Sequence, residues 1–255
     1  MDILARLAGA DGACLLGTWV KLPTLETLEM LGHAGFDFVV IDMEHGVHSH
    51  ESVYRLIFAA QAMKMSAIVR LADRSGNDVQ RVLDAGADGI MVPRVREPAE
   101  AARLGTDAIF SPQGQRGLGS TSRAGRWGLI PLSDYLLKGR EATLRMIQLE
   151  DLPALERVEE FVAVPEINGL FLGLGDLFLS SGLPPTHPTV QALVARALAA
   201  AQRRGIPCGI AVGTAEEAAR YREMGFPIIM ISNDCTLFGR AAAQLVRTAR
   251  GPTSP

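Results

Sequence analysis

The sequence predicts an α/β protein, specifically a single-domain (β/α)8 TIM barrel, for this chain of 255 residues. Three observations predict it: eight short runs rich in Val, Ile and Leu, a segment of helical period after each run, and a length typical of this barrel. Such alternation indicates a parallel sheet covered by helices. A doubly wound open sheet is the alternative, but it needs a Gly-rich phosphate loop after its first strand, and GTWVKLPT at residues 17–24 is not one.

The strand candidates are apolar runs that end in polar residues or glycine. They span residues 15–20, 36–42, 66–71, 88–93, 144–150, 167–173, 207–212 and 227–232. The helices are expected at residues 24–34, 50–63, 76–85, 97–104, 153–160, 188–204, 214–224 and 236–249. Several of them open on Thr, Ser or Asn, which can accept hydrogen bonds from the N–H groups of a first helical turn.

One segment is too long for an ordinary connection. Residues 105–143 contain SPQGQRGLGSTSRAGRWG and are rich in Gly, Ser and Arg. Long loops inside compact domains usually serve a function. We expect a Gly/Ser/Arg-rich insertion before the fifth strand of one barrel domain over residues 1–255, whose C-terminal helix can be exchanged between subunits.

Composition and charge exclude several classes of protein. The formal net charge is −3 and the basic residues form no sustained run, so no nucleic-acid partner is expected. The three widely spaced cysteines, with no CxxC pair, indicate neither a disulfide framework nor a thiolate zinc site. The N-terminal segment lacks the pattern of an export signal, and no apolar run approaches ~20 residues. We expect a cytoplasmic protein with a small-molecule partner and no membrane partner.

Polar residues gather where the predicted strands end, which is where a barrel collects its catalytic groups. They are Asp42, Glu44, His45, Arg70, Arg94, Gln148, Glu150, Asp151, Gly173, Gly175, Asp176, Asn233 and Asp234. Glu150 and Asp176 end adjacent strands, and two carboxylates at one mouth repel each other unless a positive charge lies between them. Oxygen ligands with open positions suit Mg²⁺, Mn²⁺ or a similar ion. The alternative is that these acids only cap the following helices.

A base and two cations complete this set. Asp42 and His45 are three residues apart, close enough for the carboxylate to orient the imidazole as a general base, although an ordinary loop histidine is the alternative. Arg70 ends a buried strand, where a fixed charge needs an anionic partner such as a substrate carboxylate, an enolate oxygen or one of the acids. Arg94 could do the same or point into solvent. Gly-Leu-Gly at residues 173–175 lets backbone N–H groups approach a ligand.

Two other barrel chemistries are less consistent with the sequence. His48 and His50 form a His-x-His pair of the kind that binds zinc in barrel hydrolases, but the fifth and sixth strands offer no imidazole ligand. Schiff-base chemistry needs a lysine in the mouth. Of Lys21, Lys64 and Lys138, only Lys21 ends a strand. The acids favour metal chemistry instead.

At this point the strand ends resemble those of the metal-dependent pyruvate aldolases of the HpcH/HpaI family, within the phosphoenolpyruvate/pyruvate barrel superfamily. The marks are GFDFVVIDMEHG, IVRL, AGADGIMVPRV, GQRGLGS, IQLED and GLFLGLGDL, in matching order and spacing. The resemblance covers roughly residues 15–245.

The resemblance implies a site for a divalent metal, Mg²⁺, Mn²⁺ or Co²⁺, on Glu150 and Asp176, with pyruvate chelating the metal. It further implies that Arg70 stabilises the enolate, that His45 oriented by Asp42 is the base, and that Glu44 holds waters on the metal. The expected substrate-binding residues are Trp19, Arg94, Ser120, Arg123, Gln148, Gly173, Leu174 and Gly175.

The family also implies a homo-oligomer, a hexamer built as a trimer of dimers in which neighbouring subunits help to line each site. Trp19 and the GLGST loop are the candidates for that role.

Three departures from the family pattern bear on the acceptor aldehyde. Gly-Leu-Gly-Asp at residues 173–176 replaces the common Gly-Pro-Ala-Asp, Arg94 stands where Met is common, and Asp151 stands where Thr or Ser is frequent. Arg94, Arg116 and Arg123 hint at an anionic or polyhydroxy acceptor, although arginines in a Gly-rich loop can equally pair with a neighbouring subunit.

The expected function is a class II aldolase that reversibly cleaves 4-hydroxy-2-oxo acids to pyruvate and an aldehyde. Two alternatives stay open. One is a related acyl-CoA lyase or a decarboxylating enzyme that forms carbon–carbon bonds; the other is a catalytically silent barrel acting as an assembly subunit.

Overall fold

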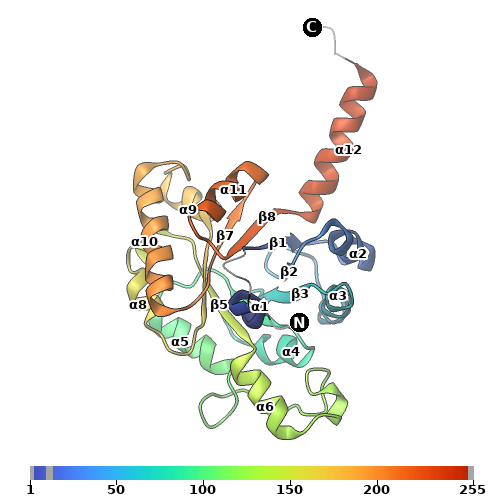
Figure 1. Ribbon diagram of the computed structural model, residues 1–255, viewed down its shortest axis with the longest axis vertical. Helices are drawn as coiled ribbons and strands as arrows, with labels where there is room; N and C mark the ends of the chain where they lie inside the picture. The colour runs from blue at the N-terminus through green and yellow to red at the C-terminus, as the bar shows by residue number, and fades with distance from the viewer. Residues whose placement is uncertain (1–2, 10–13, 252–255) are drawn as a thin grey trace.

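The computed structural model describes residues 3–9 and 14–251 of the chain, and in them eight parallel strands close into a barrel in chain order (Figure 1). The predicted fold class is therefore confirmed. The strands are β1 Leu15–Val20, β2 Phe38–Asp42, β3 Ser66–Arg70, β4 Gly89–Val92, β5 Leu144–Leu149, β6 Gly169–Leu172, β7 Cys208–Val212 and β8 Ile228–Asn233. Each of the eight lies within or within one residue of a predicted apolar run, because such runs are buried on both faces of a parallel sheet. Residues 1–2, 10–13 and 252–255, which the domain prediction also covered, lie outside the described part.

Helices surround the barrel. They are α1 Ile3–Gly9, α2 Leu25–Ala34, α3 His50–Ala62, α4 Val79–Asp84, α5 Pro98–Asp107, α6 Leu132–Glu141, α7 Leu152–Glu156, α8 Val158–Val162, α9 Leu174–Ser181, α10 Pro188–Arg204, α11 Ala215–Glu223 and α12 Asp234–Arg250, with a 3₁₀ turn at Arg126–Gly128. The helix predicted at residues 153–160 is two short helices that meet at Arg157, whose φ of −106° and ψ of 22° are not helical. The sequence did not predict α1, α6 or α9.

The barrel interior is packed with side chains rather than open. One buried cluster fills it, with Phe38, Val40, Ile68, Met146 and Phe171 among its members. A second, larger cluster lies between the strands and the helices. Ile3 of α1 joins the interior cluster and is fully buried. The barrel is therefore solid below the ends of its strands, as expected for this architecture.

The last helix does not pack along the barrel. Figure 1 shows α12 projecting away from β8 into open space, and its residues from Cys235 onward are exposed or half-exposed. Four large apolar side chains of α12 are exposed: Leu237, Phe238, Leu245 and Val246. Among the described residues, no helix combines the length and the apolar character needed to cross a bilayer.

Candidate active site

The alternation of side chains along the strands turns the polar strand ends toward the barrel axis. Val40 of β2 lies in the interior cluster, so Asp42, two residues later, points inward as well. In β3, Ile68 lies in the interior cluster, so Arg70, two residues later, also points inward. The register of the two strands places Asp42 directly beside Arg70.

Asp42 and Arg70 form a buried bidentate ion pair. Nε of Arg70 donates to Oδ1 of Asp42 at 2.9 Å, and Nη2 donates to Oδ2 at 2.7 Å. Burial alone would raise the pKa of Asp42, but the hydrogen bonds and charge of Arg70, with the backbone N–H of His45, hold that pKa below its usual range. Asp42 is therefore a permanent anion that fixes the guanidinium.

Glu44 is clamped between two arginines. Its Oε2 lies 3.1 Å from Nη1 of Arg70, and its Oε1 lies 2.9 Å from Nε of Arg94. The Glu44 side chain is only 5% exposed. Arg70 thus joins Asp42, Glu44 and, through a 3.5 Å contact, Oε1 of Gln148 into one network.

The predicted side-chain pairing of Asp42 with His45 is wrong. Asp42 Oδ1 accepts the backbone N–H of His45 at 3.2 Å, while the nearest carboxylate to the imidazole is Glu44, whose Oε2 lies 3.6 Å from Nε2. The His45 side chain is 54% exposed at the mouth. Asp42 therefore shapes the turn that carries His45, and the charge beside the imidazole belongs to Glu44.

Glu150 leaves β5 into the same mouth and is held by two donors. Its Oε1 accepts the backbone N–H of Arg94 at 2.7 Å, and its Oε2 accepts Nε2 of Gln148 at 2.7 Å. Gly173 at the end of β6 lies against this carboxylate, since a Cβ at that position would be 2.7 Å from Oε2 of Glu150. A side chain at residue 173 would therefore displace Glu150.

Asp176 lies in the first turn of α9, whose N-cap is Gly173. Asp176 and Glu150 line one cavity of about 260 Å³. Burial, the charge of Asp176 and the charge of Glu44 together raise the pKa of Glu150 to about 7. The alternative that Asp176 and Glu150 only cap helices is not what the geometry shows; it is Asp151 that caps α7, accepting the N–H of Ala154.

This donor set fits a divalent metal with an open coordination sphere. Two carboxylates repel each other in a confined space, which is the electrostatic condition that a cation relieves. No group of three or more His, Cys, Asp or Glu side chains suited to a metal occurs in the described part of the chain. Glu150 and Asp176 alone would leave positions for water and substrate, as hard oxygen-binding ions such as Mg²⁺ require.

Trp19 of β1 and Lys21, which directly follows this strand, complete the mouth. The Trp19 ring stacks on Arg70, with Cζ 4.0 Å from the ring centroid, and packs edge-on against Phe171. Nζ of Lys21 lies 3.6 Å from Oδ2 of Asp42. Trp19 thus lines the mouth of its own barrel, and Lys21, which was considered only for Schiff-base chemistry, is a third cation beside the acids.

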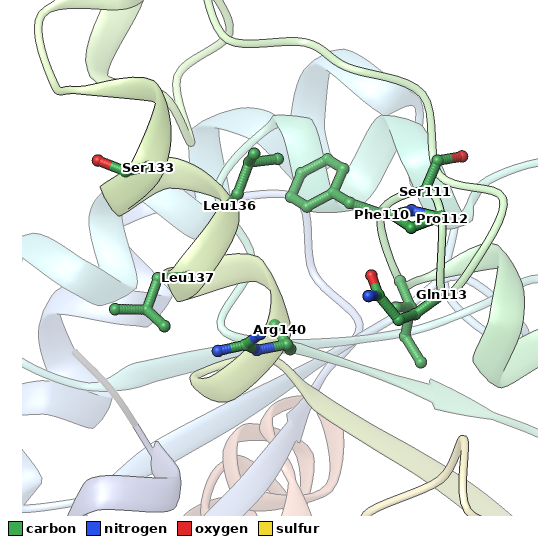
Figure 2. Close-up of a pocket in the computed structure, with 9 residues that line it drawn as sticks. Phe110, Ser111, Pro112, Gln113, Ser133, Leu136, Leu137 and Arg140 are labelled. Atoms are coloured by element: carbon green, nitrogen blue, oxygen red, sulfur yellow. The ribbon is translucent and has the colours of Figure 1, made fainter.

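Another cavity, of about 290 Å³, lies in the insertion, well away from these acids. Figure 2 shows Phe110, Ser111, Pro112 and Gln113 facing Leu136, Leu137 and Arg140 of α6. The lining contains no carboxylate. It differs in this from the cavity that Glu150 and Asp176 line.

Residues 15–241 match the sequence profile described as HpcH/HpaI aldolase/citrate lyase. The chain belongs to the HpcH/HpaI aldolase/citrate lyase family. It is 34% identical to 2-dehydro-3,6-dideoxy-6-sulfogluconate aldolase of Pseudomonas putida, covering 94% of each chain, and 30% identical to hydroxypyruvate/pyruvate aldolase of Chromohalobacter salexigens, covering 96% of each. A solved HpcH/HpaI family protein from Burkholderia cenocepacia superposes with a TM-score of 0.88 at 33% identity, over 98% of this chain and 100% of that one.

The HpcH/HpaI relatives show that this chain is an enzyme, a carbon–carbon lyase of the aldolase type. Most of the residues predicted from the sequence meet at one mouth in this family member: Asp42, Glu44, His45, Arg70, Arg94, Gln148, Glu150, Gly173 and Asp176, together with Trp19. Leu174 and Gly175 form the first turn of α9 beside them.

Ser120 and Arg123 do not lie at the mouth of their own barrel. Arg123 donates to the carbonyl of Ala85 and to Oε1 of Gln61, at the ends of α4 and α3 that lead into the opposite, N-terminal side of the strands. Ser120 lies in the same loop, where its carbonyl packs against Gly125. Within one subunit these two residues therefore cannot bind the substrate of that barrel.

The polar end of β8 has a structural role that the sequence did not reveal. Asp234 is buried and accepts the backbone N–H groups of Lys21 and Leu22, and Asn233 caps α12 by accepting the N–H of Thr236. His48 bonds to the carbonyl of Val20, and the exposed His50 pairs with Asp78. An acid at a strand end looks the same in sequence whether it faces a ligand or a neighbouring backbone.

Proposed function

We propose that this enzyme is a divalent-metal-dependent class II aldolase that reversibly cleaves 4-hydroxy-2-oxo acids to pyruvate and an aldehyde. The observation that carries the proposal is the convergence of Glu150 and Asp176 on one cavity, with the pKa of Glu150 raised to about 7, next to the network of Asp42, Arg70 and Glu44. The relatives named aldolases at 30–34% identity support the reaction class.

The substrate would enter a site that is already organised. A divalent metal on Glu150 and Asp176 would supply a Lewis acid that polarises the keto oxygen. Arg70, held rigidly by Asp42, Glu44 and Trp19, presents a fixed positive charge to the oxygen on which negative charge develops. The N–H groups in the first turn of α9 suit the carboxylate of a 2-oxo acid.

His45 is the proposed base. In cleavage its imidazole takes the proton of the C4 hydroxyl as the C3–C4 bond breaks, and in synthesis it returns that proton to the new alkoxide. The carboxylate of Glu44, 3.6 Å from Nε2, would stabilise the resulting imidazolium. The exposed position of His45 lets it meet substrates that enter from solvent.

Proton NMR of pyruvate in D₂O tests this proposal before any aldehyde is chosen. We expect the C3 methyl signal to disappear with Mg²⁺ or Mn²⁺ and to persist in EDTA, because enolate formation exchanges those protons. Glu150→Gln and Asp176→Asn should each slow the exchange by at least about 100-fold, since either change removes a metal carboxylate. Glu29→Gln, at an exposed carboxylate of α2, is the control. Exchange that survives in both Glu150→Gln and Asp176→Asn would exclude the metal assignment.

We also propose a homohexamer built from dimers in which α12 is exchanged between subunits, located in the cytoplasm. The exposed apolar side chains of α12 support exchange, because a helix with such a face is unstable alone in water. An assembled neighbour would also be the way for the loop of Ser120 and Arg123 to reach a mouth. The free state of Cys14, Cys208 and Cys235 suits a reducing compartment.

A further inference from the structure

Arg94 occupies an unusual place between the acids of the mouth. It follows β4 and has a left-handed φ of 50°, a conformation that costs energy for a residue with a side chain. In this conformation its backbone N–H donates to Glu150 while its Nε lies 2.9 Å from Oε1 of Glu44. One strained residue therefore contacts both Glu150, a proposed metal ligand, and Glu44.

The Arg94 guanidinium also faces free space. Its side chain is 54% exposed and lines the 260 Å³ cavity that Glu150 and Asp176 share with Leu179 and Ser180 of α9. Among the described residues the ion pair with Glu44 runs through Nε, which leaves the two terminal nitrogens for a ligand. A guanidinium with two parallel donors matches a planar or tetrahedral anion.

The charge of Arg94 is incompletely compensated by the protein. Glu44 is shared between Arg70 and Arg94, so neither guanidinium has this carboxylate to itself. Asp73 lies outside the mouth and interacts only weakly with Arg94, since its pKa is lowered mainly by hydrogen bonds from Ser75.

Arg96 provides a contrast within the same cavity. Its Nε donates to Asp151 at 2.9 Å, and this carboxylate pairs with no second arginine among the described residues. The charge of Arg96 is therefore matched one to one. We expect a ligand anion to be attracted more strongly to Arg94 than to Arg96, because Glu44, the partner of Arg94, also pairs with Arg70.

We propose that Arg94 selects an acceptor aldehyde whose far end carries an anion, a carboxylate or a sulfonate. This inference rests on the proposed aldolase function and names the class of its second substrate. Within one subunit the other two arginines lie away from this cavity, because Arg116 is buried against Asp84 and Tyr135, and Arg123 is bound on the N-terminal side of the barrel. Arg94 alone of the three reaches the cavity of the metal acids.

The test is a comparison of acceptors with and without a terminal anion. With pyruvate as donor, kcat/KM is measured for 4-oxobutanoate, for 3-oxopropane-1-sulfonate and for the neutral methyl ester of 4-oxobutanoate. We expect the wild type to prefer one or both anions over the ester, and the ratio of the two anions identifies which terminus it takes. Arg94→Met should lower kcat/KM for the preferred anion by about 10- to 100-fold and for the ester by less than about threefold.

Two further variants separate charge from structure. Arg94→Lys should recover part of the preference for the anion, and Arg96→Met should retain the wild-type ratio of anion to ester. If Arg94→Met lowers kcat/KM equally for all three acceptors, Arg94 acts only through Glu44, and the proposal is overturned. Wild-type enzyme that exchanges pyruvate protons but shows no preference for anions overturns this proposal alone. Absence of exchange with every divalent metal overturns the aldolase function and this inference with it.

Discussion

Asp42 and Glu44 are two residues apart and serve the same arginine, but their surroundings give them different roles. Asp42 is fully buried and saturated by donors, whereas Glu44 has the exposed imidazole of His45 beside it. The sequence could identify these acids as site residues, because they directly follow an apolar run. It could not distinguish a carboxylate that holds a backbone N–H from one that holds an imidazole, because a spacing of three residues permits both. That is why the predicted pairing of Asp42 with His45 was wrong.

The raised pKa of Glu150 predicts that the stability of the metal-free enzyme depends on pH. Its pKa in the folded protein is about 7 against an ordinary value of 4.5, so the metal-free folded state binds a proton that the unfolded state has lost. The benefit is complete below about pH 4.5 and is lost as pH rises through 7. We expect the free energy of unfolding of the metal-free enzyme to fall over this range by at most about 3 kcal/mol.

Urea denaturation in EDTA at pH 5 and pH 8 measures this difference. Glu150→Gln, which cannot ionise, should show a smaller fall than the wild type. The free energy of unfolding of Asp151→Asn, at a neighbouring but half-exposed carboxylate, should fall as much as that of the wild type. An identical fall in the wild type and Glu150→Gln would show that Glu150 titrates normally.

At the level of elements, burial decided what could be predicted. The eight strands are apolar on both faces, so their pattern is strong even over four to six residues. The helices that were missed bury few residues: α6 buries Tyr135 and Gly139, and α9 buries Leu174 and Leu177. A helix with so narrow a buried face carries little periodicity, and Gly173 and Gly175 made the start of α9 resemble a loop.

The junction of β8 and α12 is expected to be a stability determinant. The buried carboxylate of Asp234 accepts the N–H groups of Lys21, Leu22 and Cys235 at 2.8–3.1 Å, which ties the last strand to the end of β1. Asp234→Asn places a donor against these donors and should lower the free energy of unfolding by about 1–3 kcal/mol. Chemical denaturation measures it, with the exposed Glu29→Gln of α2 as the control. A loss no larger than that of the control would show that these hydrogen bonds contribute little.

For the whole molecule, the closed barrel explains why most of the site could be found in sequence. Parallel strands in chain order bring their carboxyl ends to one mouth, so residues as distant as Trp19 and Asp176 converge without any knowledge of side-chain packing. The insertion obeys no such rule. Its course depends on contacts such as those of Arg123 with Ala85 and Gln61, which no local pattern encodes.

The exposed apolar side chains of the projecting helix α12 lead to a prediction about how the subunits associate. Leu237, Phe238 and Leu245 lie on one side of α12 at 100° per residue, and each is exposed in the single chain. Phe238→Asp with Leu245→Asp should reduce the mass measured by light scattering, because the proposed exchange would bury these side chains in a partner. Ala243→Asp, on the other side of the helix, is the control. An unchanged mass in the double variant would exclude α12 as an assembly element.

The packed interior, with α1 beneath it, also determines how substrates enter the site and how products leave it. Side chains from Ile3 to Phe171 fill the barrel in the described part of the chain, so the open strand ends serve as both entrance and exit. In the proposed reaction the 2-oxo acid would lie deeper, against Arg70, and the aldehyde would lie outward, toward Arg94. In synthesis the inner molecule must therefore arrive first, and in cleavage the aldehyde must depart before pyruvate can follow, so the closed floor of the barrel imposes an order on the reaction.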